Sequence, residues 1–578
     1  MSADLPRQTQ ARRGYSIFYK GKTLLSNIDP VGQAERLADS VPMQERTLYV
    51  CLSPIYGYGL ERLMERMATH APNSAILCIE ADEHLYRISE ENFNDEITDS
   101  GKLRLTNARE KAALCVFLRQ NWGQRRFRRI HRVCLNGGWQ LFPELYDSLI
   151  EALQREIATD WSNALVMTKL GRLYIRNALR NLELLSRYPS LTQLSFGDAP
   201  VLTLGAGPSL DALLDGLERH FGGKLEKSVR PFRIVCVDTG LKALRARNIE
   251  PDLAVILESQ HWNLGDFIGL GDWVIPAAMD LSALPASGKL PGLQPWLFFT
   301  KWTELRFFDR LGKTGLLPLV FPPLGSVGLS ATAIALRLTS GPVLTGGMDF
   351  SYSIDSSHAR STPTHMAKLR RQNRFTGLLN AAALAAAAFE GAQKFTAKNS
   401  RQVLSNPALR NYRDIFEQEF SGNTRLFDTR SSGLPLGIQT LTEQEFHSLL
   451  EHTANKKRQA AAPGQENTQT VNTAGKKQLA DFLRAEHGRL LDLKNILAGK
   501  TPEEQGQPAE ESFPLQKLEI LIDECDYLWA HFPDYAETGG KRPVLQELAA
   551  ATPQALSFLK RLRAEIDAAL KIYEALLL

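Results

Sequence analysis

A glycine-rich segment between a predicted strand and a predicted helix has the residue types of an anion site. Residues 201–217, VLTLGAGPSLDALLDGL, follow the pattern of a strand that breaks at two glycines and restarts as a helix. Two glycines permit a tight turn and close approach by a ligand, and the N–H groups at a helix start bind phosphate. The segment therefore predicts a phosphate site made of Gly205, Ala206, Gly207, Pro208 and Ser209.

Three acidic residues follow other apolar runs of the same region. Asp238 ends RIVCVD, Glu258 ends LAVILE, and Asp349 follows VLTGGM, while PPLGSVGLSATAIAL supplies a second glycine-rich helix start at Ser326. Because the carboxyl ends of parallel strands meet at one edge of a sheet, we expect these side chains to gather there. A carboxylate at that edge would suit general base catalysis.

The elements that must position these residues alternate between strand and helix. Near-continuous apolar runs are typical of strands buried on both faces, and helical periodicity separates them. Residues 196–450 are therefore predicted to form a central α/β domain with a doubly wound, Rossmann-like parallel sheet. The predicted strands are VLTLG, RIVCVD, LAVILE, WVIPAAM, PWLFFT, LPLVF and GPVLTGG.

The N-terminal region is predicted to be a smaller α/β accessory domain, residues 1–160, followed by a connecting helix at 161–195. In it, SPIYGYGLERL places Gly57 and Gly59 between strand and helix, and Glu80 ends the next strand. This arrangement occurs in nucleotide-binding units, where the acid binds a ribose. Because no third glycine follows, a purely steric use of the glycines is the favoured interpretation.

The C-terminal region changes character. Residues 451–477 are polar and predict a flexible linker, and residues 478–578 predict a helical bundle. Its last helix carries an apolar stripe: Leu556, Leu559, Leu562, Ile566, Leu570 and Tyr573. Such a stripe must pack against something, which leaves the bundle itself, a second subunit of a homo-oligomer, or a helical protein substrate.

Composition excludes several classes of function. The 578 residues carry a formal charge of only +4, which gives no case for nucleic-acid binding. The six cysteines show no metal-binding spacing, the N-terminus lacks the apolar segment of a signal peptide, and the run LLNAAALAAAAF is too short to span a membrane. A cytoplasmic protein without membrane insertion is expected.

Taken in order, the central motifs resemble those of a known family. GAGPSL, VD, PDLAVILES, GSVGLSATAIAL and GPVLTGGMDFSYS with a later SSHA are similar to the central domain of the motility-associated factor (Maf) proteins. YIRNALRNL before this core and TRLFDTRSSGLPLGI after it extend the resemblance. The same domain occurs in proteins similar to 6-hydroxymethylpterin diphosphokinase of the MptE type. The resemblance implies a sialyltransferase-like sheet.

The Maf resemblance implies an enzyme and its ligands. Members of this bacterial family are glycosyltransferases that move nonulosonic acids, such as pseudaminic or legionaminic acid, from a CMP-activated donor to serine or threonine of flagellin, for flagellar assembly and motility. The first glycine turn would then hold the donor phosphate and Asp238 would lie near the nucleotide. Gly325, Ser326 and Val327 would face the pocket. Asp349 and His358 would lie near the reacting sugar. Glu258 stands where the family usually has aspartate.

The residues leave the reaction open. Asp349, Glu258 and His358 are candidates for taking the proton of the acceptor hydroxyl. One alternative is diphosphate transfer from ATP to a pterin alcohol, for which Asp238 and Glu258 would hold Mg²⁺; glycosyl transfer itself implies no firm cofactor. Another is a non-catalytic flagellin-binding assembly factor.

Overall fold

The computed structural model describes most of the chain. The described residues are 5–93, 101–123, 126–271, 273–375, 377–378, 380, 383–384, 388, 391–459, 473–498, 513–533 and 552–578. The chain divides into two compact units, Met1–Arg172 with Trp529–Ala555 and Leu173–Leu528 with Leu556–Leu578. The apolar run at 378–389 lies largely outside the described residues. Of the predicted linker, residues 460–472 lie outside them, whereas residues 451–459 and 473–477 belong to helices.

The first unit contains a small parallel α/β sheet in the order β6-β5-β4-β7. Apolar residues alternate between its faces and form a core on each. Its strands are β4 (Thr47–Leu52), β5 (Ala75–Ile79), β6 (Leu103–Thr106) and β7 (Arg129–Val133); its main helices are α1 (Pro30–Ser40), α2 (Leu60–His70), α3 (Glu83–Asn92), α5 (Lys111–Trp122) and α6 (Pro143–Val166). A three-stranded antiparallel sheet joins β1 (Arg7–Gln10), β2 (Tyr15–Tyr19) and β3 (Lys22–Thr23).

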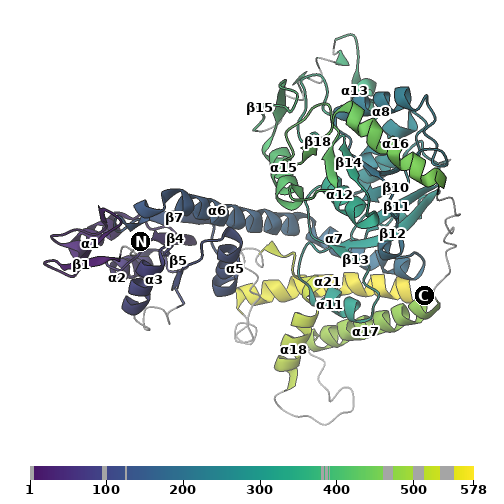
Figure 1. Cartoon of the computed structure of the whole chain (residues 1–578). Helices are drawn as coiled ribbons and strands as arrows, with labels where there is room; N and C mark the ends of the chain where they lie inside the picture. The colour runs from purple at the N-terminus through teal and green to yellow at the C-terminus, as the bar shows by residue number, and fades with distance from the viewer. Residues whose placement is uncertain are drawn as a thin grey trace. The chain divides into compact units, whose positions relative to one another are not determined.

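The second unit is built on a nine-stranded sheet in the order β13-β12-β11-β10-β9-β8-β14-β17-β18 (Figure 1). All its neighbouring strands are parallel, which confirms the predicted α/β class. The seven predicted strands are β8 (Val201–Leu204), β9 (Arg233–Val237), β10 (Leu253–Ile256), β11 (Ile275–Asp280), β12 (Leu293–Thr300), β13 (Leu319–Phe321) and β14 (Val343–Gly346). Two further strands, β17 (Leu426–Asp428) and β18 (Gln439–Thr440), were not predicted.

Helices cover both faces of this sheet, as its apolar strands require. One face packs against α8 (Ser209–His220), α9 (Leu241–Arg245) and α16 (Glu443–Gln459), and the other against α12 (Val327–Leu338) and α15 (Pro407–Phe420). Strand residues alternate between the two cores: Leu202 faces the first and Val201 the second. α12 lies over β8, β9, β10 and β14.

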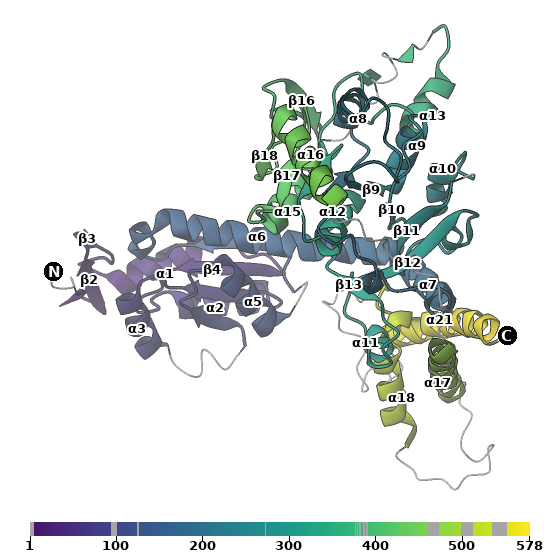
Figure 2. The ribbon, with the colours of Figure 1, turned by 45° about the vertical axis from the view of Figure 1, so that its right-hand side comes forward.

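The C-terminal helices pack at the β13 end of the sheet. Figure 2 shows α17 (Thr473–Leu497) beside α21 (Pro553–Leu577), with α18 (Phe513–Glu524) near α11 (Arg306–Lys313). The ring of Phe307 on α11 lies 5.7 Å from that of Phe482 and 4.9 Å from that of Tyr527. The helical prediction for this region is confirmed.

The apolar stripe of α21 is buried within the chain, with one correction. Leu562, Ile566, Leu570 and Tyr573 are buried and Leu559 is half-buried, but Leu556 is 53% exposed. Phe558 is buried instead, because the stripe drifts around the helix at its N-terminal end. Within the described residues, no helix combines the length and the apolar character needed to cross a membrane.

A buried ion group joins α17 to α11. Glu486 on α17 is 1% exposed and accepts two hydrogen bonds from the guanidinium of Arg310, at 2.7 and 2.9 Å. Arg489 donates a third at 2.6 Å. The C-terminal helices are therefore fixed to the central sheet by charge as well as by aromatic packing.

We predict that Arg310→Met lowers the free energy of unfolding by about 3 kcal/mol, because it removes one partner of a buried ion pair. Denaturant titration of the full chain measures this. The control is Arg484→Met, which breaks the exposed pair with Asp481 and should cost less than about 1 kcal/mol. Equal losses for the two variants would contradict the role of the buried group.

Candidate functional site

The carboxyl edge of the nine-stranded sheet contains its topological switch point. Strand order runs in one direction from β8 to β13 and in the other from β14 to β18, so it reverses between β8 and β14. Doubly wound sheets bind ligands in the crevice at this reversal. The first glycine turn follows β8 and the Asp349 turn follows β14, so two of the predicted segments flank the switch point.

The two turns at the switch point are in direct contact. The Gly205 N–H donates to the Gly346 carbonyl at 2.8 Å, and the Gly207 N–H donates to the Gly347 carbonyl at 2.7 Å. A Cβ atom on Gly205 would overlap the Gly347 carbonyl, and one on Gly207 would overlap the Asp349 carboxylate. The glycines are therefore required by the approach of one turn to the other.

Asp349 occupies the N-terminus of α8. Its Oδ2 accepts the Ser209 N–H at 2.8 Å, while its Oδ1 is buried and has no hydrogen-bond partner in the described part of the chain. Burial raises the pKa of this carboxyl, and the charge of Arg430 opposes the rise. Phe350 follows with φ of 48°, a strained conformation for a bulky residue that fixes the direction of the turn.

The predicted free amides of the first helix start are therefore already used. The N–H groups of Gly205, Gly207 and Ser209 all have protein acceptors, so that expectation is wrong for these three residues. Pro208 has no N–H to offer. Phosphate contact at this turn remains a prediction only for the Ala206 amide and the Ser209 hydroxyl, which has no hydrogen-bond partner among the described residues.

The second predicted helix start is open. Ser326 precedes α12 in an extended conformation, its hydroxyl does not cap the helix, and the first turn has no acidic residue. Across the described ranges, the N–H groups of Val327, Gly328 and Leu329 have no acceptor. A Cβ on Gly328 would lie 3.2 Å from the Met348 sulfur, so this helix start lies beside the turn that carries Asp349.

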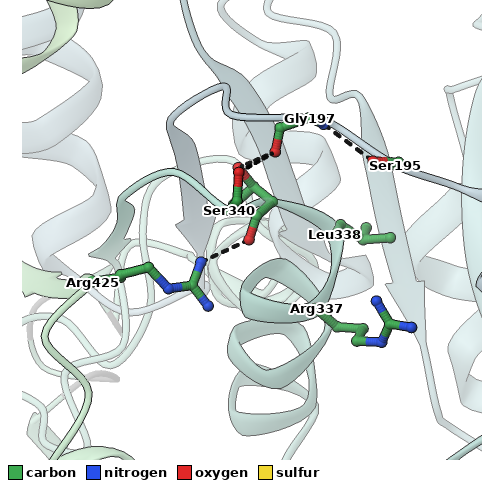
Figure 3. Close-up of a pocket in the computed structure, with 7 residues that line it drawn as sticks. Ser195, Gly197, Arg337, Leu338, Ser340 and Arg425 are labelled. Atoms are coloured by element: carbon green, nitrogen blue, oxygen red, sulfur yellow. Dashed lines mark hydrogen bonds between the residues drawn. The ribbon is translucent and has the colours of Figure 1, made fainter.

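The other end of α12 is neutralised. The Arg425 guanidinium donates to the carbonyls of Thr339 at 2.7 Å and of Leu336 and Gly341 at 3.2 Å. A surface hollow of about 460 Å³ lies here, at the amino edge of the sheet (Figure 3). None of the predicted site residues lines it, and Arg425, one of its two arginines, is held by the carbonyls at the end of α12 and just after it. The partial positive charge at the N-terminus of α12, which lies at the carboxyl edge of the sheet, is thus the one without a protein partner among the described residues.

Glu258 is an accessible carboxylate at this edge of the sheet. It is exposed, and its Oε1 accepts the Gln260 N–H at 2.8 Å. The nearby Tyr174 has its pKa raised to about 12, by burial first and then by the charge of Glu258; Tyr412 also acts on it. The Tyr412 ring lies 3.2 Å from a Cβ built on Gly325, so Tyr412 lies beside the turn that precedes α12.

Asp238 is turned into the protein. It is 3% exposed, and its two oxygens accept the Thr239 N–H at 2.8 Å and the Asn263 side-chain amide at 2.7 Å. Burial, then the charge of Asp266, raises its pKa to about 7, and burial raises that of Asp266 to about 6. A ligand role for Asp238 stays a prediction.

The predicted magnesium pair does not fit a metal ion in this arrangement. Both Asp238 oxygens accept hydrogen bonds from the protein, while Glu258 is exposed. Over the described residues, no group of three or more His, Cys, Asp and Glu side chains is arranged to hold a metal. Asp238 and Glu258 are therefore not arranged as a magnesium pair.

His358 lies beside the first glycine turn. The N–H of the next residue, Ala359, donates to the Ala206 carbonyl at 2.9 Å. The His358 ring is partly buried. Burial lowers the pKa of this imidazole, and the positive charge of Lys368 is the second cause. The structure thus brings together the glycine turn, Asp349 and His358, and places the Asp238–Gly240 turn next to Gly205.

A buried ion group behind the site was not predicted. Asp428, at the end of β17, accepts from Arg430 at 2.9 and 2.8 Å and pairs with Lys398 at 3.0 Å. Burial opposes ionisation, but hydrogen bonding and charge from Arg430 hold the pKa of Asp428 below its usual range. Arg430 also donates to the Met348 carbonyl at 2.6 Å, which supports the Asp349 turn from behind. The motif FDTRSSG contains both Asp428 and Arg430, so the sequence held the two partners of this ion pair close together.

Two asparagines in the YIRNALRNL motif fix α7 (Arg172–Asn181) to the carboxyl edge. The Asn177 amide donates to the carbonyls of Ser259 and Ser282 at 2.9 and 3.2 Å. The Asn181 amide donates to those of Leu281 and Ala283 at 2.9 and 2.8 Å. Their spacing of four residues on one helix face was visible in the sequence and was not used.

Glu80 in the first unit is not available to a ribose. It is 1% exposed and accepts hydrogen bonds from the Ser53 hydroxyl at 2.7 Å and the Asp82 N–H at 3.0 Å. Burial raises its pKa to about 7. Gly59 begins α2 with φ of 81°, and a Cβ there would meet the Ala34 carbonyl at 2.7 Å, so the steric explanation of this turn holds.

We predict that Gly207→Ala separates the two turns at the switch point and lowers the melting temperature by several degrees, because its methyl group overlaps the Asp349 carboxylate. Thermal unfolding measures this. Gly265→Ala is the control, since a Cβ there meets no atom within 4 Å. A Gly207→Ala protein as stable as the control would contradict the tight contact.

Comparison with known proteins agrees with this fold. Residues 174–355 match the family model described as 6-hydroxymethylpterin diphosphokinase MptE-like. An uncharacterised protein of Treponema pallidum (strain Nichols) is 28% identical over 584 residues, covering 98% of this chain and 95% of the relative. The structure of the Maf glycosyltransferase from Magnetospirillum magneticum AMB-1 matches with a TM-score of 0.55 and 14% identity, covering 99% of this chain and 92% of that one.

These matches confirm the resemblance at the level of domain and fold. The matched range contains β8 to β14, the open start of α12 and Asp349. The structural match extends over nearly the whole chain, including the N-terminal unit and the C-terminal helices. Residues 174–355 therefore form an MptE-like domain, in a chain that has the fold of a Maf glycosyltransferase.

Proposed function

We propose that this protein is a glycosyltransferase that moves a nonulosonic acid from a CMP-activated donor to serine or threonine of flagellin. The fold match to a Maf glycosyltransferase supports the transferase class. The observation that carries the proposal is the open start of α12, which lies at the same carboxyl edge of the sheet as the exposed carboxylate of Glu258. A cytoplasmic location and a homo-oligomer remain predictions.

The donor phosphate binds at the start of α12 in this proposal. The N–H groups of Val327, Gly328 and Leu329 point out of the helix start and have no acceptor in the part of the chain that is described. Together with the partial positive charge of the helix end, they stabilise a phosphate without a cofactor. The same donors stabilise the charge that grows on the leaving cytidine monophosphate.

Glu258 takes the proton of the acceptor. The hydroxyl oxygen of serine or threonine forms a bond to the anomeric carbon, and the bond from that carbon to the phosphate oxygen breaks with its electron pair passing to the phosphate. The hydroxyl proton passes to the Glu258 carboxylate. Among the three candidate bases, Glu258 is the exposed one, whereas Asp349 has its oxygens buried or bonded and acts by holding the two turns together.

A second candidate is ATP-dependent diphosphate transfer to a pterin alcohol, which the description of the matching family model favours. This second candidate requires that the protein turn over ATP only when both Mg²⁺ and the pterin alcohol are present. Cytidine nucleotide has no part in that reaction. The two candidates therefore separate by the nucleotide that the purified protein consumes.

We predict that the purified protein adds the mass of one or more nonulosonic acids to flagellin in the presence of the CMP-activated sugar. Glu258→Gln should lower the transfer rate by about 10²- to 10⁴-fold with CMP affinity unchanged, because only the proton acceptor is lost. Intact-mass spectrometry of flagellin measures the product.

Asp198→Asn is the matched control, because this exposed acid lies before β8 at the opposite edge of the sheet. It should transfer at the rate of the unmodified protein. Unchanged transfer in Glu258→Gln would remove Glu258 as the base. Unmodified flagellin together with pterin-dependent ATP turnover would replace the proposal with the diphosphokinase, and absence of both reactions would favour the assembly factor.

A further inference from the structure

Three polar side chains form a hydrogen-bonded chain next to the first glycine turn. Lys368 on α13 (Pro363–Arg371) donates from Nζ to the Ser357 hydroxyl at 2.9 Å. The same hydroxyl lies 3.1 Å from Nδ1 of His358. α13 has no buried residue and lies at the end of the sheet where α8 and α9 begin (Figure 2). Neither Ser357 nor Lys368 has a role in the proposed transfer so far.

The backbone around His358 is fixed on both sides. The Ser356 hydroxyl donates to the His358 carbonyl at 2.9 Å, and the Ala359 N–H donates to the Ala206 carbonyl at 2.9 Å. The Thr362 hydroxyl donates to the Ala359 carbonyl at 2.7 Å. The imidazole is therefore held beside residues 205–207, at the switch point.

Donor and acceptor chemistry assigns the protons in the hydrogen bonds that join Lys368, Ser357 and His358. A lysine ammonium can only donate, so the Ser357 oxygen accepts from Lys368 and keeps its own hydrogen for another partner. The acceptor within reach is Nδ1 of His358. A neutral imidazole that accepts at Nδ1 carries its hydrogen on Nε2. Burial and the charge of Lys368 lower the pKa of His358, so the neutral ring predominates at neutral pH.

We propose that Lys368 and Ser357 are positioning residues that hold His358 in the tautomer with its hydrogen on Nε2, which makes His358 a hydrogen-bond donor to an anionic ligand. The hydrogen bond given for the His358 ring is at Nδ1, and Nε2 has no partner among the described residues, so this donor is available. The assignment rests on the proposed function for its ligand, the phosphate of the cytidine nucleotide. His358 keeps its proton throughout and is not the base.

The first test uses two substitutions that imitate different ring nitrogens. The side-chain amide nitrogen of His358→Gln reaches the position of Nε2, whereas that of His358→Asn reaches only the position of Nδ1. Calorimetric titration with CMP should give near-normal affinity for His358→Gln and about tenfold weaker affinity for His358→Asn. The reverse order, or equal losses, would overturn the donor assignment.

The second test needs no substrate and so separates this inference from the proposed function. Histidine ¹⁵N NMR of the full chain, with His358→Gln to assign the signal, should show hydrogen on Nε2 and an acceptor at Nδ1. Ser357→Ala and Lys368→Met should each shift the signal toward a mixture of tautomers. Ser357→Thr and Lys368→Arg keep the hydroxyl and the positive charge, so each should retain the signal of the unmodified protein.

The outcomes of the two tests are distinguishable. Hydrogen on Nδ1 in the unmodified protein would overturn the inference whatever sugar or nucleotide is bound. The expected tautomer in a protein that binds no CMP would leave the chain Lys368, Ser357 and His358 intact and count against the proposed donor instead.

Discussion

The contact between the Asp349 carboxylate and the Ser209 N–H is the interaction on which the candidate site depends. It joins the turns after β8 and β14 at the point where the strand order of the sheet reverses. It also fills the N-terminus of α8 with a carboxylate of the protein itself, so that helix start has less to offer a ligand. The proposed anion site therefore lies at α12, whose first-turn amides have no acceptor among the described residues and whose C-terminal carbonyls bind Arg425.

The surroundings of this contact all serve to hold it. Arg430, paired with Asp428, supports the Met348 carbonyl from behind, and the strained backbone of Phe350 directs the turn. Gly205 and Gly207 allow the turns to touch. On the other side, Asn177 and Asn181 fix α7 to the ends of β10 and β11 near Glu258. Charge, hydrogen bonding and steric need thus act on one edge of the sheet, as expected of a preorganised site.

The sequence predicted the strands and turns of this site better than the hydrogen bonds and the exposure of its side chains. Seven buried strands were visible as apolar runs, whereas β17 and β18 have only three and two residues and are too short for a pattern. The glycine turn was correctly placed, but its amides were expected to be free. Their acceptor, Asp349, is 140 residues away in the chain, and no local pattern shows a contact at that separation. The exposure of Glu258 and the burial of Asp238 likewise depend on tertiary packing.

The most direct test of the account is the affinity for CMP of Val327→Pro against Val327→Ala. Proline suits the first position of a helix and Ser326 before it is extended, so this substitution deletes one N–H donor without disturbing α12. Calorimetric titration should show CMP binding about tenfold or more weaker in Val327→Pro and near normal in Val327→Ala. Equal affinity in the two variants, with both folded, would contradict a donor phosphate at the start of α12.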